Sequence, residues 1–131
     1  MGYRANQAFR RQVLVVENDE IMLAFLTQAL ELAGYEALGA FNRPQAEQIL
    51  AAERTAADVI LVVDVVLQGE SGLDLAGDFA RLHPASPILF ISGYASDVLF
   101  LDGKAPGAHT GFLRKPFSKD DLLEAVERLT R

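Results

Sequence analysis

The chain of 131 residues contains no cysteine, which excludes disulfides, thiolate metal sites and thiol catalysis. It contains no apolar run that approaches the roughly 20 residues needed to span a bilayer. Its first eleven residues carry three arginines but lack the apolar segment of a secretory signal. We therefore expect a cytoplasmic protein, with residues 1–11 as a flexible basic tail and residues 12–131 as one folded domain.

Positive charge is also scarce, since 12 Lys and Arg residues face 18 Asp and Glu residues and the formal net charge is −6. Affinity for nucleic acid depends on basic patches, and the adjacent pair Arg10-Arg11 lies in the predicted tail. Direct nucleic-acid binding is therefore not expected. The two histidines, His83 and His109, lie in loop-like contexts without the spacing of metal ligands.

Short apolar segments alternate with amphipathic ones along the chain. Residues 58–63 are an almost unbroken apolar run, typical of a strand buried on both faces of a parallel sheet, and the run ends at Asp64. Residues 118–129 carry the clearest helix signals, with Ser118 as a cap and two acids in the first turn. The alternation predicts an α/β domain with a doubly wound, five-stranded parallel sheet in the order 2-1-3-4-5. The predicted strands are 13–16, 35–41, 58–63, 87–91 and 112–114, and the predicted helices are 19–33, 42–50, 73–82 and 118–129.

The segment from Ser96 to Thr110 fits this alternation poorly. Two glycines and a proline interrupt it, so only residues 96–101 can form a helix, of one or two turns. We predict a short or mobile element there, in which Phe100 and Leu101 either face the core or form an exposed contact patch.

Polar side chains follow four of the five predicted strands. They are Glu17 and Asn18 after the first strand, Asp64 after the third, Ser92 after the fourth and Lys115 after the fifth. Because the carboxyl ends of parallel strands meet at one edge of a sheet, we expect these side chains to lie together. Clustered oxygen ligands suit Mg²⁺, and a lysine and a hydroxyl can bind an added anion. The combination favours phosphoryl transfer to a carboxylate.

Five sequence elements resemble, in order and spacing, the receiver domains of two-component response regulators. They are Glu17-Asn18, Asp64, the loop 67–72, Ser92 and Lys115-Pro116-Phe117, and the resemblance covers about residues 12–130. It implies a flavodoxin-like three-layer sandwich in which Asp64 accepts a phosphoryl group from a histidine kinase or phosphotransfer protein. It also implies a signalling protein rather than an enzyme, one that takes part only in its own phosphorylation and dephosphorylation.

The resemblance implies roles for individual residues at this edge of the sheet. Asp64 would be the acceptor, and Ser92 and Lys115 would bind the phosphoryl oxygens. The Mg²⁺ ligands would be Glu17, Asn18, Asp64 and the backbone carbonyl of Val66.

The resemblance also implies a switch and an output surface. Ser92 would move toward the phosphoryl group and Phe112 would fill the vacated space, although Phe112 is equally well read as static core. The Lys115–Pro116 bond would be cis. A downstream protein would bind the face formed by residues 96–110, the fifth strand and the last helix, and receivers often form homodimers through the same face.

The chain departs from the family pattern after its first strand, where two carboxylates are usual and Glu17-Asn18 stands instead. An amide oxygen can bind a metal ion but carries no charge, so we expect weaker Mg²⁺ binding and slower phosphorylation. Asp19 is expected to cap the following helix rather than to replace the missing acid. Gln68 occupies the usual proline position, which is expected to loosen the loop after Asp64.

Two other functions compete with a phospho-acceptor. A degenerate receiver, acting as a phosphorylation-independent interaction module, is suggested by Asn18. A small nucleotide- or flavin-binding enzyme would need a glycine-rich or hydroxyl-rich phosphate loop after the first strand, where residues 17–20 are acidic instead. The sequence leaves open the cognate kinase, the output partner, and whether the chain is a single-domain protein or a receiver from a larger one.

Overall fold

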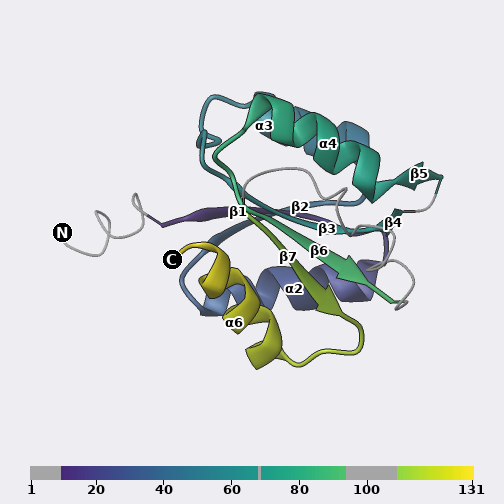
Figure 1. The fold of residues 1–131 in the computed structure, drawn as a ribbon, viewed down its shortest axis with the longest axis vertical. Helices are drawn as coiled ribbons and strands as arrows, with labels where there is room; N and C mark the ends of the chain where they lie inside the picture. The colour runs from purple at the N-terminus through teal and green to yellow at the C-terminus, as the bar shows by residue number, and fades with distance from the viewer. Residues whose placement is uncertain (1–9, 68, 94–108) are drawn as a thin grey trace.

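The computed structural model describes residues 10–67, 69–93 and 109–131. Five parallel strands form one sheet in the order β2-β1-β3-β6-β7, which confirms the predicted order. Helices α3 and α4 cover one face of the sheet and α2 and α6 cover the other, so the domain has three layers (Figure 1). Within the described ranges, no helix is long and apolar enough to cross a membrane. The strands of the sheet are β1 (Gln12–Val16), β2 (Glu36–Ala40), β3 (Ile60–Asp64), β6 (Ile88–Ser92) and β7 (Thr110–Arg114), and the helices are α2 (Glu20–Leu32), α3 (Arg43–Ala51), α4 (Gly72–Leu82) and α6 (Lys119–Leu129).

The three central strands, β1, β3 and β6, are buried along their whole length. Because successive side chains of a strand point to opposite faces, each strand contributes to two apolar clusters. Val16 and Val63 pack in the cluster beneath α3 and α4, whereas Val15 and Val62 pack in the cluster beneath α2 and α6. Burial on both faces explains why residues 58–63 form an apolar run without alternation.

Each helix begins at a polar side chain that accepts hydrogen bonds from its first free amides. Asp19 caps α2, Asn42 caps α3 and Ser71 caps α4. Ser118 caps α6 and exchanges a reciprocal bond with Asp121, which completes a capping box. The predicted caps Asp19 and Ser118 are therefore confirmed.

A small antiparallel hairpin, β4 (Val66–Leu67) with β5 (Glu70–Ser71), was not predicted. Two residues per strand carry no periodicity that a sequence pattern can reveal. Gly69 at its tip has a positive φ of 78°, a conformation that glycine adopts without steric cost. The predictions for Gln68 and for most of the segment 96–110 lie outside the described residues.

Strand β2 lies at one edge of the sheet, and side chains accept hydrogen bonds from two amides along this edge. The amide of Ala37 donates to Glu31 Oε2 at 2.9 Å, and the amide of Phe41, just after the strand, donates to Gln45 Oε1 at 2.8 Å. Side chains of the flanking helices therefore satisfy edge amides that the sheet leaves unpaired.

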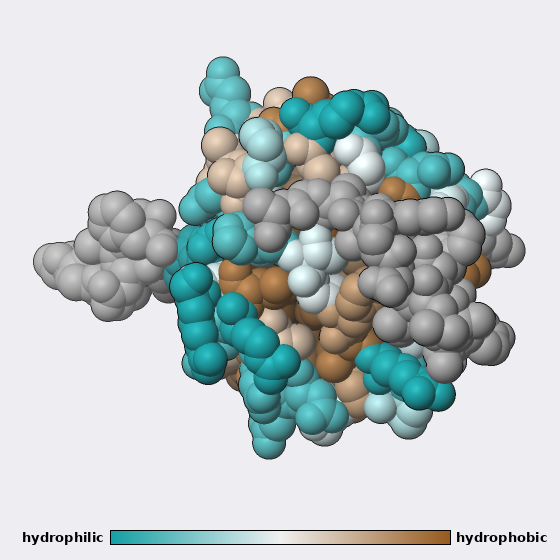
Figure 2. Space-filling model, in the orientation of Figure 1, coloured by the Kyte–Doolittle hydropathy of each residue, from teal (hydrophilic) through white to brown (hydrophobic). Residues whose placement is uncertain are grey.

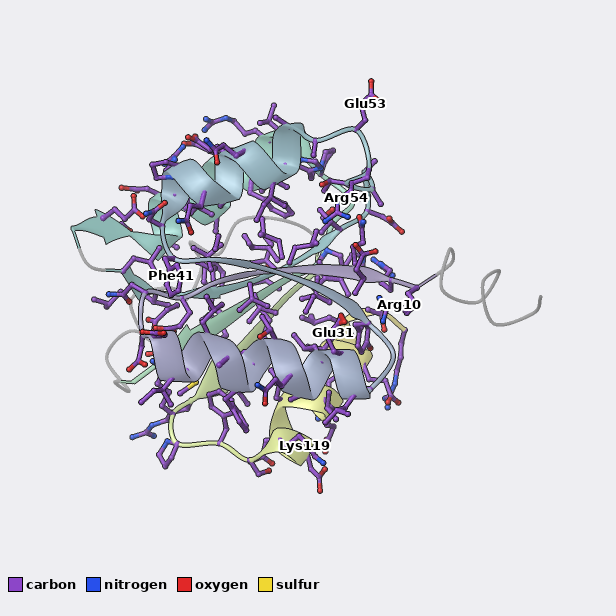
Figure 3. The ribbon with its side chains drawn as sticks, turned by 180° about the vertical axis from the view of Figure 1, so that it is seen from behind. Arg10, Glu31, Phe41, Glu53, Arg54 and Lys119 are labelled. Carbon is purple, nitrogen blue, oxygen red and sulfur yellow. The ribbon has the colours of Figure 1, made fainter. Side chains whose placement is uncertain are left out.

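The two arginines that precede β1 contact the folded domain. Arg11 donates to the Asp58 carbonyl at 2.9 Å, and the Arg10 guanidinium lies 3.6 Å from the Glu31 carboxylate on α2 (Figure 3). Arg11 also accepts a backbone hydrogen bond from Glu36 in β2. These contacts fix residues 10 and 11 against the sheet.

Candidate functional site

Four of the five polar residues expected at the sheet edge, all but Ser92, lie around one open hollow at the carboxyl ends of the strands. Asp64 is the last residue of β3, and Glu17 and Lys115 directly follow β1 and β7. The hollow has a volume of about 480 Å³. It is lined by Glu17, Asn18, Asp19, Asp64, Val66, Gly93 and Lys115.

The Asp64 carboxylate is held at both of its oxygens. Oδ2 accepts a hydrogen bond from Lys115 Nζ at 2.7 Å, and Oδ1 accepts one from the Val66 amide at 2.9 Å. The residue is only 6% exposed, yet it lines the open hollow. The carboxylate is therefore fixed in orientation and accessible from one side.

The Glu17 carboxylate is almost fully buried and only half satisfied. Its Oε1 accepts from the Asp19 amide at 3.1 Å, whereas Oε2 has no hydrogen-bond partner and lies 3.7 Å from Lys115 Nζ. Burial, together with the neighbouring Asp64, raises the pKa of Glu17 to about 7. A buried carboxylate oxygen without a partner is uncommon, and such an oxygen is a suitable ligand for a hard cation.

Lys115 joins the two acids and also anchors the chain beside Ser92. Burial by itself would lower the pKa of its ammonium group. The hydrogen bond to Asp64 and the negative charges of Asp64 and Glu17 outweigh burial, so the pKa of Lys115 is raised. The Lys115 amide donates to the Ser92 carbonyl at 2.7 Å, and the Lys115–Pro116 peptide bond is cis. The neighbouring acids therefore stabilise the cationic form of Lys115.

Three carboxylates line the hollow, those of Glu17, Asp19 and Asp64. Asn18 is exposed at its rim, and Asp19 Oδ1 accepts from the amides of Ile21 and Met22 as the cap of α2. No group of three or more acids, histidines or cysteines in the described ranges is arranged to hold a metal ion. The two lining carboxylates that cap no helix are those of Glu17 and Asp64.

Ser92 lies on β6, the neighbour of β3, and Phe112 lies on β7, the edge strand that pairs with β6. Ser92 ends β6 one position beyond Ile91, the register partner of Asp64, and it is 1% exposed. Phe112 in β7 is 37% exposed and stacks on Phe90 of β6, with ring centroids 5.7 Å apart. Ser92 therefore lies near the carboxyl end of β3, whereas Phe112 lies two residues earlier along the sheet.

A sequence model of the response regulator receiver domain matches residues 13–127. The chain belongs to the response regulator receiver family.

Relatives of the receiver include single-domain and larger proteins. It is 33% identical over 119 residues to the response regulator receiver protein CpdR of Brucella abortus, covering 91% of this chain and 96% of the relative. It is 37% identical over 118 residues to nodulation protein W of Bradyrhizobium diazoefficiens, covering 90% of this chain and 50% of that protein. Among solved structures, the chemotaxis response regulator CheY4 of Vibrio cholerae superposes with a TM-score of 0.76 at 28% identity, covering 92% of this chain and 98% of that one.

Two residues of the receiver matter for the site and were assigned no role from sequence. A Cβ atom built on Gly72 would lie 1.9 Å from the Asp64 carbonyl oxygen, so only glycine fits at this crossing. Glu70 accepts a hydrogen bond from the Arg43 amide at the start of α3. The glycine at the start of the helix can be seen in the sequence. The contact of Glu70 joins segments far apart in the chain, so no local pattern indicates it.

Proposed function

We propose that this receiver accepts a phosphoryl group on Asp64 from a histidine kinase or phosphotransfer protein and signals through protein–protein interaction. The single observation that carries the proposal is the oriented Asp64 carboxylate, paired with Lys115 in an open hollow. An Asp64 oxygen attacks phosphorus, the bond from phosphorus to the donor nitrogen breaks, and its electron pair stays with the donor imidazole. Lys115 offsets the charge of the transferred group, and Ser92 donates to it.

The oxygen donors around Asp64 fit Mg²⁺. The ligands would be Oε2 of Glu17, which has no hydrogen-bond partner, with the Asn18 side-chain oxygen, Asp64 and the Val66 carbonyl. Bound Mg²⁺ would supply positive charge that lowers the cost of bringing a phosphoryl group to a carboxylate.

Treatment of the receiver with acetyl phosphate and Mg²⁺ tests the proposal. We expect one slowly migrating band on Phos-tag electrophoresis, dependent on Mg²⁺. Borohydride reduction followed by peptide mass spectrometry should convert residue 64, and no other acid, to homoserine. Absence of the band across the whole Mg²⁺ titration would contradict the proposal.

Asn18→Asp should strengthen Mg²⁺ binding. The substitution adds a carboxylate at position 18 beside the hollow, and one added negative charge within a few ångströms of a divalent cation corresponds to about tenfold in affinity. Isothermal titration calorimetry measures the dissociation constant, and the phosphorylation rate at low Mg²⁺ should rise with it.

Gln28→Glu is the matched control for that prediction. It adds the same charge to the surface of α2, in a depression separate from the hollow. We expect no change in Mg²⁺ affinity. Equal affinities for wild type and Asn18→Asp would show that position 18 does not face the ion.

The second candidate function is a phosphorylation-independent interaction module. It is favoured by the exposed amide of Asn18, which leaves position 18 beside the hollow uncharged. Beryllofluoride with Mg²⁺ separates the two candidates, because a phospho-acceptor should show amide shifts around Asp64 and Lys115 in NMR spectra. A pure interaction module should show none.

We place the output surface on β7 and α6, with the segment 96–110 as its predicted continuation. Figure 2 shows apolar side chains in the middle of this face, bordered by hydrophilic ones. Phe112 lies at a shallow hollow of about 180 Å³, together with Asp121, Glu124 and Arg128 of α6. This mixture of an exposed ring and charged residues suits a downstream protein or a second copy of the receiver.

A further inference from the structure

The β4–β5 hairpin connects the phosphorylation site to the helical layer above it. It begins two residues after Asp64, and its first residue, Val66, donates its amide to Asp64 Oδ1 at 2.9 Å. With two residues in each strand, a hairpin of this size is not stable by itself. The position of Val66 therefore depends on what holds the hairpin.

Besides the bond from Val66 to Asp64, three contacts of the described residues hold the hairpin to the domain. At its base, the Gly72 amide donates to the Val65 carbonyl at 3.0 Å, and the Leu67 side chain is buried in the core. Farther from the base, Glu70 Oε1 accepts from the Arg43 amide at 2.8 Å. The Glu70 contact reaches across 27 residues of sequence to a different layer of the fold.

Arg43 is a firm attachment point. It is the first residue of α3, and Asn42 caps that helix by accepting from the Gln45 amide at 2.9 Å. The Arg43 guanidinium pairs with Asp78 on α4 and with Glu47 on α3. The residue is thus fixed by its own helix and by the neighbouring one.

A carboxylate is well suited to this attachment. The amide of the first helical residue has no partner within the helix, and the helix dipole favours negative charge at that end. Glu70 supplies both an acceptor oxygen and a negative charge, and the residue is partly buried. The bond is consequently stronger than one between two neutral groups.

We propose that Glu70 is a positioning residue for the phosphorylation site. By bonding to the Arg43 amide it fixes the hairpin, keeps the Val66 amide on Asp64, and holds the Val66 carbonyl at the edge of the hollow. Its effect on phosphorylation rests on the proposed function, whereas its effect on the Val66 amide does not.

Amide hydrogen exchange of the unmodified protein tests the inference directly. In Glu70→Ala the Val66 amide should exchange about tenfold faster, the factor expected when one hydrogen bond to a charged group is lost. Glu70→Gln retains an acceptor oxygen and should restore most of the protection. Ser118→Ala removes the cap of a different helix, α6, and should leave Val66 exchange unchanged.

Phosphorylation by acetyl phosphate is the second readout. Glu70→Ala should slow it, and Glu70→Gln should recover it, in the order of the exchange rates. Unchanged Val66 exchange in Glu70→Ala, or equal acceleration in both variants, would overturn the inference. The Val66 exchange rates can follow the expected order while neither wild type nor the variants incorporate phosphate. In that case Glu70 positions the hairpin, and the proposed function fails.

Discussion

Asp64→Asn should abolish phosphoryl incorporation from acetyl phosphate while preserving the fold. The amide nitrogen is not a nucleophile at neutral pH, and the remaining oxygen can still accept from the Val66 amide or from Lys115. The loss should be complete within detection, because among the described residues no other carboxylate accepts from both Lys115 and a backbone amide in the hollow. Intact-protein mass spectrometry measures the incorporation.

Circular dichroism and a thermal melt of Asp64→Asn show whether the fold is preserved. We expect a transition close to that of wild type, since the substitution keeps the shape of the side chain and removes one charge from a pair of neighbouring acids. Glu17→Gln is a useful companion variant, because it should weaken Mg²⁺ binding while leaving the acceptor Asp64 in place. Residual incorporation in Asp64→Asn would mean that another residue is the acceptor.

Gly72→Ala should destabilise the domain strongly, although it adds only one methyl group. The new Cβ would lie 1.9 Å from the Asp64 carbonyl oxygen and 3.1 Å from the Val65 carbonyl oxygen, and both atoms belong to the backbone. Neither can rotate away, so β3 and the start of α4 must separate. We expect a loss of about 3 kcal/mol in the free energy of unfolding, at the upper end of the usual cost of overpacking.

Gly77→Ala is the matched control, because it makes the same change in the same helix. A Cβ at Gly77 meets no atom within 4 Å. Alanine is favoured over glycine inside a helix by about 1 kcal/mol, so this variant should be slightly more stable than wild type. Urea unfolding followed by circular dichroism compares the two, and a Gly72→Ala midpoint equal to that of wild type would refute the steric argument.

Strand order and the gathering of Glu17, Asp64 and Lys115 were predictable because each depends on a local pattern. Apolar runs mark buried strands, and parallel strands deliver the residues that follow them to one edge. Asn18 was visible as a departure from the family pattern because its position directly after the first strand was predictable in the same way. What sequence could not reveal depends on tertiary contact. Glu17 Oε2 is buried without a hydrogen-bond partner, and Glu70 bonds to the amide of Arg43 in another layer of the fold.

The side-chain hydrogen bonds along β2 bear on how the chain behaves at high concentration. An exposed strand edge is a template on which another chain can add a strand, and this is a common start of aggregation. At this edge an incoming strand would first have to displace Glu31 from Ala37 and Gln45 from Phe41. The helices thus obstruct strand addition at two positions of this edge, and we expect a variant that lacks both acceptors to aggregate more readily.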